Sequence, residues 1–354
     1  MNVCVIGAGP SGLTTVKQLL DEGHTVRCFE RTDDIGGIWQ RNPNPDVDAA
    51  TMKVFDNLIL TISIRLMCYS DFMVGPDRVF YTHKQYREYL GAYADRFGLR
   101  QHITLGATVT RVQKGQDGRW TVTFQENGAP RSEVFDAVSV CCGPFQSPDV
   151  SSVPGIDTFE GEVVHSYKYR NNAKFVGKRA LIVGLAESGA DLAREVSDVA
   201  ASSTLSIRSY SFLLPRLHEG EYATDATDTR ALCYDQFARA VQAPPTPMLH
   251  GDNAVERALF FSAVWALGIL LGPVEYLLSL FNPAPKHDKN GLGEAPNPPK
   301  LDIGCEWTEE NIDAINEWNR RSHDYKSNWT QQIIFSKNVS FIPNLVSGKL
   351  GLND

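Results

Sequence analysis

The sequence predicts an α/β fold built from two Rossmann-like units, because two glycine-rich loops each stand between an apolar run and a helical pattern. The first loop, Gly7–Gly12, reads G-A-G-P-S-G and follows the apolar run Asn2–Ile6. Leu13, Val16 and Leu19 then recur at helical spacing. A strand, G-x-G-x-x-G and a helix in this order form the fingerprint of a dinucleotide site, whereas the loop alone would be a weak signal.

Each glycine of the first loop has a separate physical task. Gly7 makes the tight turn, Gly9 lets the backbone approach a pyrophosphate, and Gly12 lets the helix pack close to the strand. Free N–H groups at the start of the helix then face the phosphates. The strand Thr25–Phe29 ends at Glu30, 23 residues after Gly7, where a ribose-binding carboxylate is expected. An ordinary glycine-rich turn is the alternative, and the strand, helix and acid in register argue against it.

The same pattern occurs a second time. The apolar strand Lys178–Val183 leads into Gly184–Gly189, which reads G-L-A-E-S-G, and a helical segment follows. The next strand, Thr204–Ile207, ends at Arg208 where the first unit has an acid, and an arginine pairs with a 2′-phosphate. The second unit is therefore expected to prefer NADPH, although an ordinary surface arginine is the alternative. Ala186 replaces the middle glycine, and its methyl group crowds the pyrophosphate position.

Composition and charge are those of a globular enzyme. The 354 residues suggest two to three domains, and the net charge of −8 argues against a nucleic-acid partner. Seven cysteines are scattered without metal-ligand spacing, so we expect no metal site and a reducing, cytoplasmic compartment. The chain starts on its first strand, so no signal peptide is expected. Two dinucleotide sites in one chain indicate electron transfer from NADPH to a flavin.

Four stretches resemble one family. Phe159–Tyr169 is similar to the F-x-G-x-x-x-H-x-x-x-[YF] signature of flavin-containing monooxygenases, which are related to Baeyer–Villiger enzymes. Glu30–Trp39 resembles the segment that carries the ribose-binding acid and then wraps the flavin. Met67–Phe72 and Tyr86–Gly98 resemble the next two landmarks, and the resemblance runs almost continuously from residue 1 to about 210.

This resemblance implies tightly held FAD, NADPH as the reductant, and insertion of one oxygen atom from O2 into a small organic substrate through a C4a-(hydro)peroxyflavin. Three alternatives stay open. The chain could be an uncoupled NADPH oxidase, or a flavoenzyme that rearranges a natural product. It could also be a truncated non-catalytic fragment or pseudo-enzyme, because the C-terminal part of the family fold is expected to be missing.

The expected domains follow from the same comparison. An FAD-binding domain is expected over residues 1–157, completed by about 335–354, and an NADPH-binding domain over 158–334. A largely helical insertion is expected within the second domain at about 211–330, including a helix that starts at Thr308. The uncharged run 258–274 favours a helix over the substrate cleft, with an interfacial membrane contact or a true membrane span as alternatives. A homo-oligomer is a further expectation.

Two residues are candidate catalytic groups under the resemblance. Thr61 stands where the family has an asparagine beside the flavin ring, although Asn57, four residues away, is an alternative match. A hydroxyl offers one short donor where an amide offers more, so the reaction type could differ. His165 lies in the signature, and we favour a role in positioning the cofactor and domains over acid–base chemistry, because no paired carboxylate is identifiable nearby.

The expected cofactor-binding residues of the first domain are Gly7, Gly9, Pro10, Ser11, Gly12, Glu30, Arg31, Gly37, Ile38, Trp39 and Val112. Those of the second domain are Gly184, Ala186, Glu187, Ser188, Gly189 and Arg208.

Overall fold

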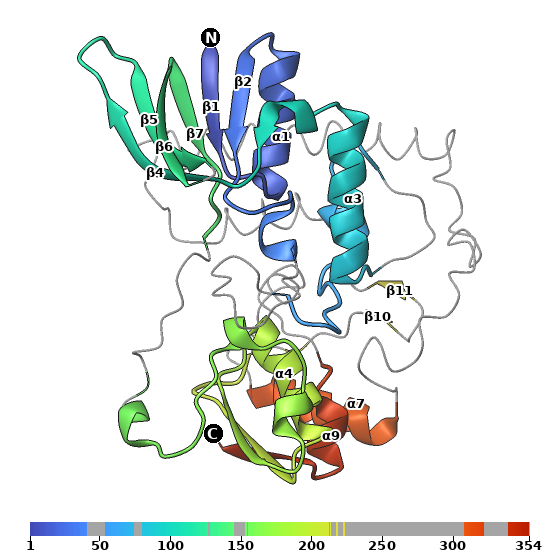
Figure 1. Ribbon diagram of the computed structural model, residues 1–354. Helices are drawn as coiled ribbons and strands as arrows, with labels where there is room; N and C mark the ends of the chain where they lie inside the picture. Colours follow the sequence, from blue (N-terminus) through green and yellow to red (C-terminus); the bar gives the residue numbers. More distant parts are fainter. Residues whose placement is uncertain are drawn as a thin grey trace, which may run out of the picture.

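The computed structural model describes two sheet-based units and the segments that join them (Figure 1). The residues that the structure describes are 1–40, 54–73, 80–126, 128–144, 153, 155–211, 213, 217–218, 222–223, 308–321 and 339–353. We call residues 1–144 the first unit, and residues 166–211 together with 308–353 the second unit. The N-terminus lies on the first sheet and the C-terminus on the second unit (Figure 1).

The first unit is a parallel sheet with the strand order β3-β2-β1-β7. Its strands are β1 (Asn2–Ile6), β2 (Thr25–Phe29), β3 (Ile103–Thr104) and β7 (Ala137–Val140). Helix α1 (Pro10–Asp21) connects β1 to β2 as a crossover between parallel neighbours. Because β1 and β2 begin and end where the apolar runs do, the local sequence pattern decides their bounds.

Aromatic side chains on α3 (His83–Arg96) form much of the core beneath this sheet. Tyr86, Leu90 and Tyr93 are buried, as their helical spacing predicts, and Gly98 ends the helix with a φ of 63°. Thr82 begins the helix with a capping box, in which its hydroxyl accepts from the backbone N–H of Gln85. The short helix α2 (Ile64–Met67) packs on the same core through Ile64.

A three-stranded antiparallel sheet covers the other side of the first sheet. Its strands are β4 (Ala107–Lys114), β5 (Trp120–Glu126) and β6 (Ala129–Phe135), in the order β4-β5-β6. Phe124 and Phe135 meet Phe29 of β2 in a separate apolar cluster, with ring centroids 4.2 Å and 6.2 Å from that of Phe29.

The second unit repeats the strand–loop–helix–strand pattern. Strand β8 (Arg179–Val183), helix α4 (Glu187–Ser197) and strand β9 (Ser202–Ser206) follow one another, and β8 pairs with β9 in parallel. The two repeats confirm the predicted α/β class with two Rossmann-like units. The remaining short elements are η1 (Gly37–Trp39), η2 (Arg100–His102), η3 (Ile156–Thr158), η4 (Ser166–Lys168), η5 (Ala173–Phe175), β10 (Leu217–His218) and β11 (Tyr222–Ala223).

The C-terminal residues belong to the second unit, which corrects one predicted boundary. Residues 335–354 were expected to complete the first domain, but β12 (Leu350–Asn353) pairs in parallel with β9 and gives the order β12-β9-β8. Helix α9 (Ile342–Val346) packs beside α4 and α7 (Glu309–Arg321). The reason is apolar burial, because Phe341, Ile342 and Leu350 lie in one cluster with residues of α4 and β9.

Helix α7 agrees with the helix expected to start at Thr308. The backbone N–H of Asn311 donates to the hydroxyl of Thr308, and Ile315 and Trp318 are buried. Most of the expected insertion, including the run 258–274, lies outside the described residues. Among the helices that the structure does describe, none combines the length and apolar character needed to cross a bilayer.

We predict that Trp318→Ala destabilises the second unit selectively. Trp318 is buried, its indole N–H donates to the backbone carbonyl of Ser211, and its ring lies 5.4 Å from that of Phe341. Removing such a ring typically lowers the free energy of unfolding by about 3–5 kcal/mol. Hydrogen exchange should accelerate in α4 and β9 and stay unchanged in β1 and α1. Acceleration confined to the first unit would contradict the corrected boundary.

Candidate nucleotide-binding sites

The first glycine loop is held in a shape that demands glycine at both ends. Gly7 has a φ of 101°, and its N–H donates to the carbonyl of Phe29 over 2.8 Å. A Cβ on Gly12 would lie 1.9 Å from the carbonyl oxygen of Gly7, which no side chain tolerates. A Cβ on Gly7 would meet the carbonyl oxygen of Cys141 at 2.6 Å. These two glycines therefore seat the start of α1 directly against the end of β1.

Gly9 has a different role, because the protein itself does not require a glycine there. Its φ is −77°, and a Cβ would find its nearest neighbour, the Cα of Gly37, at 3.6 Å. Gly9 is the N-cap of α1 and carries no side-chain cap, so N–H groups of the first turn lack an intrahelical partner. An uncrowded helix N-terminus of this kind suits the pyrophosphate of a dinucleotide, which fits the flavin nucleotide expected here.

Glu30 lies immediately after β2 and faces this loop. It is 5% exposed, and its Oε2 accepts from the backbone N–H of Ala8 over 2.7 Å. Its Oε1 accepts from the backbone N–H and the hydroxyl of Thr32, over 3.0 Å and 2.8 Å. A carboxylate has about four acceptor positions, so one remains for a ribose hydroxyl. The three bonds fix the carboxylate in place and also support the loop.

The residues after Glu30 return to the loop. Gly36, with a φ of 116°, donates its N–H to the carbonyl of Ala8 over 2.9 Å. Gly37 follows at a φ of 58°, where a Cβ would lie 3.1 Å from the Cα of Gly9. Trp39 packs edge-on against Tyr86 with ring centroids 4.9 Å apart. The expected positions Gly37, Ile38 and Trp39 thus lie in η1 beside the first loop.

The other expected residues of the first unit divide into two groups. Pro10 and Ser11 lie in the first turn of α1. Arg31 is exposed, and its charge lowers the pKa of the nearby Cys142 thiol. Burial has the larger and opposite effect, so the pKa of Cys142 is raised overall. Val112 lies on β4, where it pairs with Val122 and packs against the antiparallel sheet's apolar cluster. The structure therefore places Val112 in a packing position.

The second loop repeats the construction of the first. Gly184 has a φ of 94°, and its N–H donates to the carbonyl of Ser206 over 2.8 Å. A Cβ on Gly189 would lie 2.3 Å from the carbonyl oxygen of Gly184. Ala186 is the exposed N-cap of α4, and Glu187 and Ser188 begin that helix. The backbone fits a dinucleotide, and the methyl group of Ala186 lies at the mouth of the loop.

Arg208 lies two residues beyond the end of β9. Strand β9 is the parallel neighbour of β8, and the second loop begins where β8 ends. Arg208 is exposed, and within the described residues it makes no ion pair or hydrogen bond. Its guanidinium is therefore available to a 2′-phosphate, and this availability also agrees with an ordinary surface arginine.

The two candidate catalytic residues lie in separate places. His165 is half-buried and caps η4, where its Nδ1 accepts from the backbone N–H of Tyr167 over 3.2 Å. This local bond agrees with a positioning role. Thr61 is half-buried between Leu60, which lies in the core of the first unit, and α2. Asn57, the alternative match, is exposed and lies close enough to Glu195 of the second unit to lower the pKa of that carboxyl.

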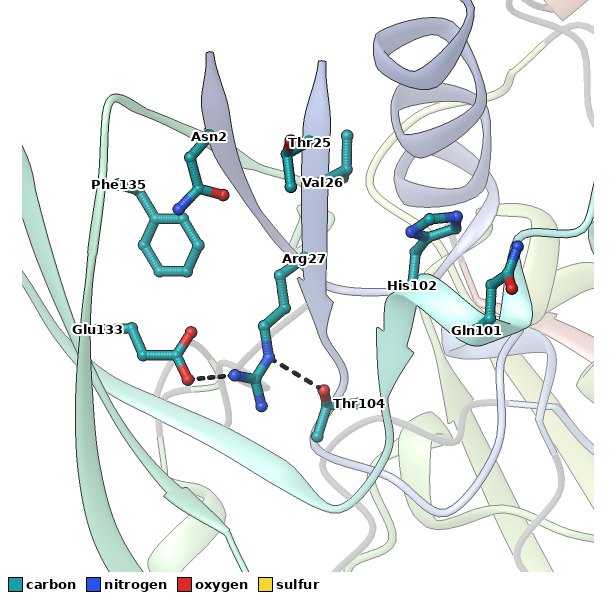
Figure 2. Close-up of a pocket in the computed structure, with 9 residues that line it drawn as sticks. All are labelled: Asn2, Thr25, Val26, Arg27, Gln101, His102, Thr104, Glu133 and Phe135. Atoms are coloured by element: carbon teal, nitrogen blue, oxygen red, sulfur yellow. Dashed lines mark hydrogen bonds and ion pairs between the residues drawn. The ribbon is translucent and has the colours of Figure 1, made fainter. Parts of the chain in front are cut away.

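A pocket of about 400 Å³ lies away from all of these residues. Figure 2 shows Arg27 between Glu133 and Thr104 in this pocket, which also includes Asn2 and Thr25 at the amino ends of β1 and β2. Ligands of open parallel sheets bind at the carboxyl ends of the strands, where the glycine loops are. The pocket contains none of the predicted site residues, so we do not assign the dinucleotide to it.

Two contacts at the first loop were missed by sequence reasoning. One is the bond from the N–H of Gly36 to the carbonyl of Ala8, for which the Gly-Gly pair at 36 and 37 is the available sequence signal. The hydroxyl of Tyr69 donates to the carbonyl of Pro10 over 2.8 Å and so ties the Met67–Phe72 landmark to the start of α1. No local pattern indicates that contact.

Comparison with known proteins identifies the family. Residues 1–242 match the family described as flavin-binding monooxygenase-like. The chain belongs to this family. Membership confirms the predicted recognition of this chain as a flavin-containing monooxygenase relative.

Individual relatives agree with this assignment. The chain is 41% identical over 215 residues to a 4-hydroxybenzoate brominase (decarboxylating) of Pseudoalteromonas luteoviolacea, covering 60% of this chain and 40% of the relative. It is 40% identical over 237 residues to an N-oxide-forming dimethylaniline monooxygenase 4 of Mus musculus, covering 65% and 42%. The structure of S-allyl-L-cysteine S-oxygenase from Allium sativum matches with a TM-score of 0.54 at 32% identity, covering 58% and 51%. The chain spans about two fifths of the length of these curated relatives.

The geometry predicts destabilisation of different size for two glycine substitutions in the first loop. Gly12→Ala places a methyl group against the backbone of Gly7, so it should lower the free energy of unfolding by about 1–3 kcal/mol. Gly9→Ala meets no such contact and should cost less than about 1 kcal/mol, the difference between glycine and alanine at an N-cap. Urea unfolding followed by circular dichroism measures both. Equal destabilisation by the two variants would contradict the close approach of α1 to β1 at Gly12.

Proposed function

We propose that this chain is an NADPH- and FAD-dependent monooxygenase that inserts one oxygen atom from O2 into a small organic substrate. The single observation that carries the proposal is the pair of glycine loops in one member of a flavin-binding monooxygenase-like family. FAD is assigned to the loop beside Glu30, and NADPH to the loop beside Arg208. The balanced reaction consumes NADPH, H⁺, O2 and substrate and yields NADP⁺, water and the oxygenated substrate.

FAD, when bound, supplies the redox chemistry: it accepts a hydride from NADPH and passes electrons to O2. The residues of the chain bind and orient the two nucleotides. Glu30 would accept a hydrogen bond from a ribose hydroxyl at its remaining acceptor position. The backbone N–H groups in the first turn of α1 would face the pyrophosphate. Arg208 pairs with the 2′-phosphate of NADPH, and His165 holds the signature segment through its bond to Tyr167.

The visible spectrum of the purified chain tests this proposal. We expect FAD to bind with a flavin absorbance band that bleaches when NADPH is added under anaerobic conditions. Gly9→Ala is the matched variant, because it keeps the fold but occupies the space in front of α1, and it should weaken FAD binding. A folded chain that takes up no flavin at micromolar FAD would overturn the proposal and favour the non-catalytic alternative.

A second candidate function rests on a specific relative. A 4-hydroxybenzoate brominase is 41% identical to this chain over 215 residues, so oxidation of bromide with bromination of a phenol is an alternative use of the same two cofactor sites. Incubation with 4-hydroxybenzoate, NADPH and O2, with and without bromide, distinguishes the two. A brominated product formed only with bromide supports the alternative, and an oxygenated product without bromide supports the leading proposal.

Location and assembly are also proposals. We propose a cytoplasmic protein in which residues 258–274 lie over the substrate cleft; peripheral membrane contact through these residues is the alternative, and a homo-oligomer is a separate proposal. Carbonate washing of membranes should release the protein. Retention after that wash would indicate a true anchor.

We predict that Arg208→Ala weakens the preference for NADPH over NADH. A hydrogen bond to a charged group contributes about 1.5–3 kcal/mol, so the preference should fall about 10- to 100-fold. Flavin content should not change. The matched control is Arg179→Ala, because Arg179 is also exposed but lies at the amino end of β8. Equal reduction of the flavin by NADH and NADPH in the unchanged chain would remove Arg208 from the site.

We predict that Thr61 leaves oxygen use partly uncoupled. Its single hydroxyl replaces the amide that the family resemblance places beside the flavin, and one well-placed donor in a dry site contributes about 2.7–4 kcal/mol. Thr61→Asn should therefore lower the hydrogen peroxide released per NADPH oxidised. A peroxide assay beside NADPH absorbance measures this ratio. No change in Thr61→Asn, together with a change in Asn57→Ala, would move the role to Asn57.

A further inference from the structure

One segment belongs to both units at once. Residues 54–60, which we call the crossing segment, lie in the core of the first unit at one end, where Leu60 is buried and its N–H donates to the carbonyl of Tyr81 over 2.9 Å. At the other end Phe55 packs against Tyr169 and Val196, and the N–H of Asp56 donates to the carbonyl of Arg170 over 2.8 Å. The crossing segment then leads directly into Thr61.

A buried pair of polar side chains, Tyr169 and Glu195, lies between the crossing segment and α4. Tyr169 is 2% exposed and Glu195, on α4, is 3% exposed. The hydroxyl of Tyr169 donates to Oε2 of Glu195 over 2.5 Å, and the exposed side chain of Asn57 lies close enough to this carboxyl to lower its pKa. The ring of Tyr169 lies 5.6 Å from that of Phe55, at an angle of 72°. We call Asn57, Tyr169 and Glu195 the polar clamp.

The polar clamp stabilises the fold less than an apolar contact of the same size would. Burial raises the pKa of Glu195, while the hydrogen bond from Tyr169, the nearby side chain of Asn57 and the charge of Arg194 oppose that rise. Its Oε1 has no hydrogen-bond partner among the described residues. A buried carboxyl that is only partly hydrogen-bonded is generally less stabilising than an apolar contact of the same size. What the cluster does provide is one defined geometry between three segments that are distant in sequence.

We propose that the polar clamp couples nucleotide binding at the second loop to the position of the crossing segment, and hence of Thr61. The proposal rests on the proposed function of the second loop. Helix α4 begins at Glu187, beside Gly184, and Glu195 lies eight residues further along the same helix, which is about 12 Å at 1.5 Å per residue. A nucleotide that orders the start of α4 therefore also orders the helix that carries Glu195. Glu195, Tyr169 and Asn57 are positioning residues in this scheme.

Hydrogen exchange of the unliganded chain tests whether the clamp holds the crossing segment. Tyr169→Phe removes only the hydroxyl, because the ring keeps its contacts with Phe55 and Phe175. We expect exchange in residues 54–60 to become about tenfold faster, with no change in β1 and α1. The matched control is Tyr93→Phe, an equally buried tyrosine of the first unit, which should leave 54–60 unchanged. Unchanged exchange in Tyr169→Phe would overturn the clamp.

Addition of NADP⁺ tests the coupling. In the unchanged chain NADP⁺ should slow exchange in both α4 and residues 54–60, and in Tyr169→Phe it should slow α4 alone. Glu195→Gln keeps an acceptor for Tyr169 and should retain the coupling, whereas Glu195→Leu should lose it. If NADP⁺ slows α4 but not 54–60 in the unchanged chain, the coupling is wrong and the nucleotide site stands. If NADP⁺ slows neither, the proposed nucleotide site fails and the coupling falls with it.

Discussion

The close approach of a helix to a strand at each glycine loop is the constraint on which both units depend. In the first unit the carbonyl of Gly7 occupies the space where a Cβ of Gly12 would be, and in the second unit Gly184 and Gly189 stand in the same relation. This contact sets where α1 and α4 begin relative to the strands that precede them. Glu30 lies near the N-terminus of α1 because β2 is the parallel neighbour of β1, and β9 is likewise the parallel neighbour of β8.

The parts of the fold that could be predicted from the sequence are those decided by neighbours along the chain. Strands β1 and β2 have the expected bounds and helix α3 the expected buried residues, because a short apolar run and helical spacing are local signals. The pairing of β12 was assigned to the wrong unit. Its partner, β9, lies almost 150 residues earlier, and a strand of only four residues carries no signal for one sheet over another.

The candidate sites show the same division. The type and position of Glu30 were predictable, because a carboxylate at the end of the second strand is part of a spaced pattern. Its bonds to Ala8 and Thr32, which fix its orientation, were not. The polar clamp was not predictable either, because Asn57, Tyr169 and Glu195 come from three distant segments, and the signature that ends at Tyr169 does not indicate a contact with Glu195. Asn57 was considered only as an alternative match for Thr61.

The two loops differ in a way that suits different cofactor lifetimes under the proposed function. The first loop is enclosed: Glu30 is buried, Gly37 packs against Gly9, and Tyr69 closes the start of α1. The second is open, since Gly184, Ala186 and Arg208 are all exposed. A resident FAD benefits from an enclosed loop that slows its release, whereas NADP⁺ must leave after each reaction. An alanine in place of the middle glycine weakens the second site without disturbing its backbone, which is consistent with a nucleotide that exchanges.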